Sequence, residues 1–262
     1  GTLARRADRL AFPTTVWFAD GRALLPAVAE PLAAPALPAE SHLAFRDVIA
    51  DAGATPWVEH GVVVGEVRGL EVCRVVDEPT VGHVAELGDV DVHAAAMSAA
   101  RGPSLEVGVG ANDREAFRLL HGDIPTVDAL AAVVDTVRDV RSADAPQHPL
   151  NRLARERYLR WRLEAEPILV DAVDVVPAEP PTPRANLKDP VPCVARATRA
   201  DASVVTLVCS VGVDLDLVGF VADVQATTDT PIAVVVPSRD HVPITAELLA
   251  LLAEPVEVLT VD

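Results

Sequence analysis

The last quarter of the sequence constrains the fold most, because short aliphatic runs alternate there with stretches of helical periodicity. The runs are long enough for strands and far too short to cross a membrane. Buried strands that alternate with helices pair in parallel through crossover connections. The pattern predicts an α/β fold with a hairpin of Val191–Ala197 and Ser203–Cys209, helices at Asp214–Thr227 and Thr245–Ala253, and strands at Ile232–Val236 and Val256–Val261.

Prolines divide the rest of the sequence. Residues 1–40 are predicted to be a proline- and alanine-rich N-terminal arm, with one strand that closes in a turn at Asp20 and Gly21, and this arm wraps the body of the protein or reaches a neighbouring subunit. Residues 177–192 are a second proline-rich stretch, interpreted as a connector. We therefore expect two small mixed-sheet α/β modules with flanking helices, at 41–176 and 193–262.

A strand-to-helix corner lies at the centre of the first module. The strand Leu105–Val109 ends in a glycine-marked turn, and a helix begins at Asn112 or Asp113. Such corners present chemical groups in α/β proteins. A hairpin is expected at Trp57–Val76, and helices at 41–50, 91–101, 126–141 and 151–166. Residues 105–120 align without gaps with residues 207–222. Two explanations of this similarity remain open: a tandem pair of related units, or only the features that any strand-turn-helix unit requires.

The formal net charge of −17 limits the partners of the chain. Nucleic-acid affinity depends largely on cations that displace counterions, so we expect no nucleic-acid partner. The three cysteines lack CxxC spacing, which favours packed, reduced thiols over disulfides or zinc. No signal peptide is visible at the N-terminus. We therefore expect a cytoplasmic protein with no membrane partner.

Three glutamates are the candidate site residues: Glu66 and Glu71 on the predicted hairpin, and Glu106 on the next strand. In one interpretation, such carboxylates face solvent and pair with Arg68 and Arg74. In the other, Glu106 and Glu71, or Glu66, converge around magnesium or manganese, which prefer oxygen ligands. The sequence leaves both interpretations open.

The order helix, hairpin, strand, helix, strand resembles the PD-(D/E)xK nuclease-like superfamily. The resemblance implies that Glu106 is the acid of the D/E-x-K triplet, but Gly108 occupies the position of the lysine. Glu71 and Asp77 are candidates for the upstream acid. In the second copy of the corner, Val208 and Ser210 occupy the two triplet positions. The resemblance therefore implies a degenerate relative, in which activation of a water molecule is impaired.

The leading functional hypothesis is a non-catalytic protein-interaction or scaffold module without a cofactor. The alternative is a divalent-metal-dependent phosphodiesterase or related hydrolase that uses Glu106 with Glu66 or Glu71. A third hypothesis is a small-ligand pocket at the strand ends near 108–112 and 212–214. A homodimer is also expected, because a long arm on a compact domain needs a surface on which to lie.

Overall fold

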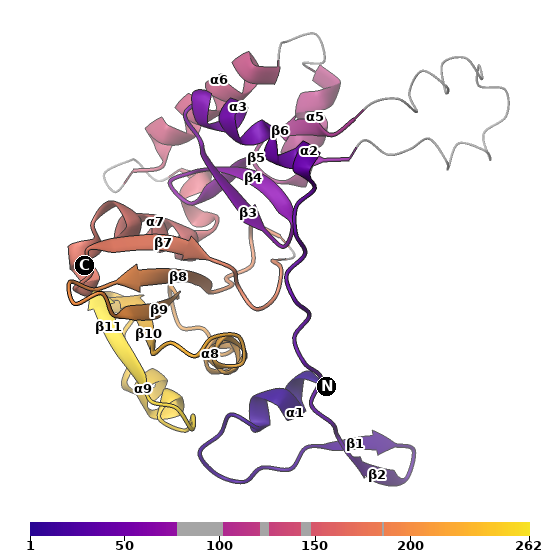
Figure 1. The fold of residues 1–262 in the computed structure, drawn as a ribbon, viewed down its shortest axis with the longest axis vertical. Coiled ribbons are helices and arrows are strands. Elements are labelled where there is room, and N and C mark those ends of the chain that lie inside the picture. The colour runs from indigo at the N-terminus through magenta and orange to yellow at the C-terminus, as the bar shows by residue number, and fades with distance from the viewer. Residues whose placement is uncertain (78–101, 121–125, 143–147, 185) are drawn as a thin grey trace, which may run out of the picture. The chain divides into compact units, whose positions relative to one another are not determined.

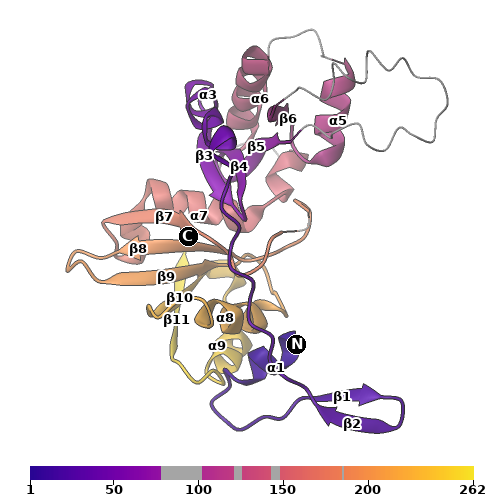
Figure 2. The ribbon, with the colours of Figure 1, turned by 45° about the vertical axis from the view of Figure 1, so that its right-hand side comes forward.

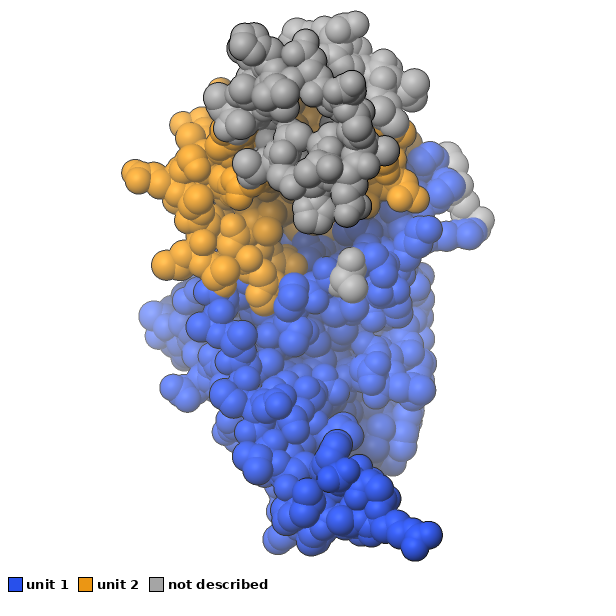
Figure 3. All heavy atoms as spheres, turned by 90° about the vertical axis from the view of Figure 1, so that its right-hand side faces the viewer, with its two compact units in different colours: residues 1–35, 146–262 blue, residues 36–145 orange. Residues whose placement is uncertain are grey.

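The computed structural model describes the chain except for residues 78–101, 121–125, 143–147 and 185. It contains two compact units. Unit 1 comprises residues 1–35 and 146–262, and unit 2 comprises residues 36–145 (Figure 3). The helix expected at 91–101 lies outside the described residues. Unit 2 is therefore an insertion between the two segments of unit 1.

Unit 1 is built on a five-stranded sheet with the order β11-β10-β9-β8-β7. β7 pairs antiparallel with β8, and β8 with β9, whereas β9, β10 and β11 run parallel. This mixed sheet, with helices between its parallel strands, confirms the α/β class (Figure 1). The strands are β7 (Asp174–Ala178), β8 (Cys193–Thr198), β9 (Val204–Cys209), β10 (Ile232–Pro237) and β11 (Val256–Val261).

Both faces of this sheet are covered. Along β10, Ala233 and Val235 enter one core, while Val234 and Val236 enter the other. The first core also takes residues from α7 (Arg155–Ala165) and the 3-10 turn η3 (Pro167–Val170). The second takes residues from α8 (Leu217–Gln225) and α9 (Pro243–Leu249). Burial on both faces explains why β9 and β10 are nearly continuous aliphatic runs. Two further 3-10 turns are η2 (Pro149–Arg152) and η4 (Ser238–Asp240).

The boundary between the units differs from the one expected at 177–192. β7, which precedes most of this stretch, pairs with β8, which follows it, so that Val175 lies opposite Ala197. The proline-rich stretch is thus a long hairpin loop within one sheet. Prolines interrupt regular structure, but they do not determine whether the flanking strands pair. Consequently the module expected at 41–176 is divided, and α7, η3 and β7 belong to unit 1.

The first helix, α1 (Thr2–Ala7), packs against α8 of the same chain. Arg5 Nε donates to Asp223 Oδ1 at 3.1 Å, and Arg6 Nε donates to Asp223 Oδ2 at 2.9 Å. The Asp223 side chain is only 2% exposed, so two guanidinium groups compensate one buried carboxylate. The first part of the arm therefore wraps the body of the protein, which was one of the two expected arrangements.

The next part of the arm forms a small hairpin. Leu10 makes an isolated bridge to Leu252, and the chain then enters β1 (Trp17–Asp20) and β2 (Ala23–Pro26). These strands pair antiparallel as a separate two-stranded sheet (Figure 2). Gly21 has a φ of 58°, as a tight hairpin turn requires. The predicted turn at Asp20 and Gly21 is confirmed.

Unit 2 is a four-stranded antiparallel sheet with the order β3-β4-β5-β6. Its helices include the predicted one at 126–141, where Leu130 and Val134 are fully buried. Val63 and Val72 of the sheet are also fully buried. The elements are α2 (Glu40–Leu43), α3 (Phe45–Asp51), β3 (Thr55–Glu59), β4 (Val62–Val67), β5 (Leu70–Val76), β6 (Ser104–Val107), α5 (Ala111–Leu120) and α6 (Thr126–Val140).

Candidate functional site

The pairing of β5 with β6 positions the candidate carboxylates of unit 2. Arg74 lies opposite Glu106 in this antiparallel ladder. On the other side of β5, Glu71 lies opposite Glu66 of β4, next to a register shift between Gly65 and Glu66. The sheet therefore gathers acidic and basic side chains from three neighbouring strands at one place.

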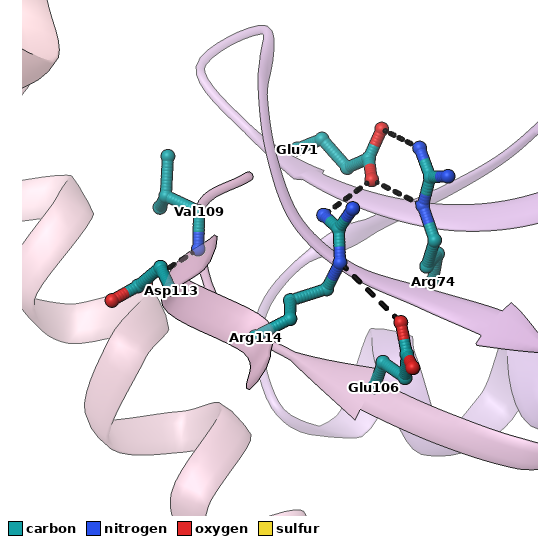
Figure 4. A network of polar contacts seen from close by, with 6 residues as sticks. All are labelled: Glu71, Arg74, Glu106, Val109, Asp113 and Arg114. Atoms are coloured by element: carbon teal, nitrogen blue, oxygen red, sulfur yellow. Dashed lines mark hydrogen bonds and ion pairs between the residues drawn. The ribbon is translucent and has the colours of Figure 1, made fainter. Parts of the chain in front are cut away.

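The corner that follows β6 adds a second arginine. Gly108 has a φ of 136°, and a Cβ atom there would lie 2.9 Å from the backbone nitrogen of Arg114. Only glycine fits this close approach. Helix α5 begins at Ala111, one or two residues before the predicted start, and Asp113 Oδ2 accepts a hydrogen bond from Val109 N at 2.7 Å. This tight corner directs Arg114 toward the sheet (Figure 4).

Glu71 is the centre of the resulting network (Figure 4). Its Oε1 accepts hydrogen bonds from Arg74 Nε at 2.7 Å and from Arg114 Nη1 at 3.0 Å. Its Oε2 accepts from Arg74 Nη2 at 3.0 Å. Arg114 Nε lies 3.5 Å from Glu106 Oε2, so Arg114 stands between the two carboxylates. The structure thus brings Glu71 and Glu106 into one cluster, but through a guanidinium group.

The carboxylate of Glu71 and the guanidinium of Arg114 are both buried, so each depends on the other for compensation of its charge. The side chains of Glu71 and Arg114 are 7% and 8% exposed, whereas that of Glu106 is 34% exposed. Burial lowers the pKa of Arg114, and Glu71 and Glu106 oppose this effect. The hydrogen bonds from Arg74 to Glu71 raise the pKa of Arg74. Removing either arginine would leave part of a buried carboxylate without its partner, which is costly.

The remaining residues considered from the sequence are Glu66, Arg68 and Asp77. Glu66 is 5% exposed and lies opposite Glu71, while Arg68 donates to the carbonyl oxygens of Arg138 and Arg141 at 3.0 and 2.7 Å. Asp77, the other candidate for the upstream acid, accepts from His42 Nε2 at 2.8 Å when that nitrogen carries the proton. Asp77 is therefore engaged by a histidine of α2.

The arrangement is suited to structure more than to binding a cation. A divalent ion placed between Glu71 and Glu106 would have to displace the guanidinium of Arg114 and remain close to that of Arg74. Like charges at such distances repel strongly in a buried setting. Within the part of the chain that the structure describes, no group of three or more His, Cys, Asp or Glu side chains is arranged to hold a metal ion.

The element order behind the nuclease-like resemblance is found in unit 1. It runs α7, the hairpin β7–β8, then β9, α8 and β10. Glu106 lies instead in unit 2, where β6 is followed by the helices α5 and α6. In unit 1 the two triplet positions, Val208 and Ser210, are buried at 0% and 1% exposure. The unit with this element order therefore has no ionisable side chain at these two positions.

A cleft of about 420 Å³ lies in unit 1, at the start of β9 and the end of α8. Its wall includes a hydroxyl chain in which Thr206 and Thr230 are 2.6 Å apart and Thr230 and Thr228 are 2.9 Å apart. The small-ligand hypothesis expects a pocket at the strand ends near 108–112 and 212–214, and the second range follows the other end of β9. The cleft therefore lies at the end of this strand opposite to the predicted one.

Sequence reasoning did not single out Arg114, although Arg114 joins both carboxylates. One signal was available, since Arg114 is the only basic residue between Arg101 and Arg118, within a strongly acidic chain. A basic residue in the first turn of a helix is also unfavourable unless a carboxylate compensates it. The two features together indicate a buried partner, but they do not identify it.

Comparisons with known proteins do not extend this description. No protein-family model, curated protein or solved structure matches the chain. Among the helices of the described residues, none combines the length and the apolar character needed to span a membrane.

Proposed function

We propose that this chain is a non-catalytic protein-interaction module whose unit 1 has a degenerate nuclease-like scaffold. The observation that carries the proposal is the hairpin β1–β2. Every residue of both strands is exposed, including the large apolar side chains of Trp17, Phe18, Leu24 and Leu25. Exposed apolar groups gathered on one element are typical of surfaces that bind another protein.

An isolated two-stranded hairpin is at best marginally stable in water. Trp17 lies opposite Pro26, and Phe18 lies opposite Leu25, so each face of the hairpin carries one aromatic ring. A partner that covers these rings would supply the apolar contacts that unit 1 does not provide. This requirement favours an interaction function for the arm.

The absence of catalysis is supported by the pairing of Glu71 with Arg74 and Arg114. Such a network stabilises the corner of unit 2, and its arginines compete with any metal ion for the carboxylates. The cytoplasmic location is part of the same proposal. Cys73, Cys193 and Cys209 are free and buried, which suits a reducing compartment.

The test is a phosphodiesterase assay with manganese and bis(p-nitrophenyl) phosphate, paired with calorimetric titration of manganese. We expect no hydrolysis above the manganese blank and no binding heat. A manganese-dependent turnover that Glu106→Gln abolishes would overturn the proposal and favour the hydrolase. The matched control is Glu115→Gln, because Glu115 is an exposed carboxylate on α5, close to Glu106 in sequence.

A further inference from the structure

We propose that the partner of the hairpin β1–β2 is a second copy of this chain, which receives the hairpin on the outer face of α9. This inference rests on the proposed interaction function and identifies its partner. Two copies related by a two-fold axis would exchange hairpins, so that each copy gives one hairpin and receives one.

The receiving surface is an apolar stripe on unit 1, which we call the α9 stripe and which consists of Ile244, Leu248 and Leu251. These residues are 51%, 40% and 42% exposed. Their spacing of four and then three residues places them on one side of α9 and the turn that follows it. Leu249 and Leu252 face the core on the other side, at 1% and 4% exposure. The helix thus has two apolar faces, and unit 1 covers only one of them.

The hairpin and the α9 stripe are connected by a short segment. Ala11 N donates to Leu251 O at 2.8 Å, so the arm is fixed beside the stripe. Residues 12–16 then lead to Trp17, and five residues span at most about 18 Å. Both surfaces therefore belong to one end of unit 1. A two-fold axis near this end brings each hairpin close to the stripe of the other copy.

The exposed area is that of a weak, concentration-dependent dimer. One face of the hairpin, which carries Phe18 and Leu25, meets the stripe, and these two side chains, half to two-thirds exposed, offer ~200 Å². With a similar area from the stripe, two symmetric contacts bury ~800–900 Å², which lies below the ~1,200–2,000 Å² of stable interfaces and within the range of transient ones. A second copy can therefore cover this face of the hairpin at high protein concentration.

Charge argues against a lipid surface as the partner. The chain has a formal net charge of −17, and anionic membranes attract clusters of Lys and Arg. The hairpin turn holds Asp20 and Arg22, one charge of each sign, in place of an apolar tip that could insert into a bilayer. A second copy needs no such attraction, because the contact joins apolar surfaces.

The test is sedimentation velocity of the full chain from about 1 to 100 μM, with two variants that each alter only exposed side chains. The hairpin variant is Phe18→Ser with Leu25→Ser, and the stripe variant is Ile244→Ser with Leu248→Ser. We expect a wild-type dimer, and for each variant alone a dissociation constant raised at least ~100-fold. Mixing the two variants should give a heterodimer, because the intact hairpin of the stripe variant can then bind the intact stripe of the hairpin variant.

The matched control is Val213→Ser with Leu215→Ser, two apolar residues that are 66% and 90% exposed elsewhere in unit 1. This control should remain dimeric. Any of three results would overturn the inference: the wild-type chain is a monomer, the hairpin variant stays dimeric, or the mixture forms no heterodimer. Monomer that sediments with neutral phosphatidylcholine vesicles only when the hairpin is intact would overturn it in favour of lipid.

The two proposals fail in different ways. A monomeric chain without turnover overturns only the second copy as partner, since another protein can still cover the hairpin. Metal-dependent turnover that Glu106→Gln abolishes overturns the non-catalytic function, whatever the state of association.

Discussion

The clamp on Asp223 allows a quantitative test of how the N-terminal helix is held. The double variant Arg5→Met with Arg6→Met removes both guanidinium groups from a carboxylate that is 2% exposed. If α1 stayed in place, the unpaired charge would cost about 3–5 kcal/mol. Ala4 is the one buried residue of α1, and its apolar burial contributes on the order of 1 kcal/mol. Release of α1 is therefore the cheaper outcome, and we expect the helix to detach.

Native-state hydrogen exchange is the appropriate assay, because it reports local and global opening separately. The amide of Ala11, bonded to Leu251 O, should lose its protection in the double variant, while protection in β10 persists. Each single variant should cost only about 1–2 kcal/mol in local opening, since the other arginine still compensates the charge. Adding Asp223→Asn to the double variant should restore part of the protection. A double variant that retains full protection at Ala11 would refute the reasoning.

Two further predictions concern unit 2. Burial raises the pKa of Cys73 from 9.0 to about 12, so the native thiol should not react with iodoacetamide at pH 8. The free energy of unfolding should fall above pH 9, because the thiol of the unfolded chain ionises there while the native thiol stays protonated. Rapid alkylation of the folded protein at pH 8 would contradict the first expectation. Gly65→Ala should cost about 1–3 kcal/mol in urea unfolding, because its Cβ would lie 2.7 Å from Ile49 Cγ2, whereas Gly102→Ala, in open space, should cost much less.

The parts of the fold that depend on local periodicity could be predicted from the sequence. Helix α6 has its stripe at Leu130, Val134 and Val137, and all three side chains are buried. β10 was equally clear, because a strand buried on both faces reads as a continuous aliphatic run. In these elements the signal lies within the segment itself, so no knowledge of distant contacts is needed.

The parts that depend on distant pairing could not be predicted. Arg114 is 43 residues from Glu71, and Arg5 is 218 residues from Asp223. Charge patterns within a segment do not specify which distant partner an arginine reaches. The loop at 177–192 illustrates the same limit, because its prolines look alike whether the flanking strands pair or separate. Of the candidate site, the sequence could therefore supply the acidic residues and Arg74, which lies three residues from Glu71, but not the distant Arg114.

The insertion of unit 2 within unit 1 imposes an order on synthesis by the ribosome. Residues 36–145 are complete before any strand of the five-stranded sheet has been translated. At ~5–20 residues per second, Asp223 is made roughly 4–16 s after residue 145. During this interval α1 and the apolar hairpin are already outside the ribosome, while α8 and β11 do not yet exist. Helix α1 is thus translated before unit 2 but reaches its place on α8 only after unit 2 is complete, and the apolar rings of the hairpin stay exposed throughout this interval.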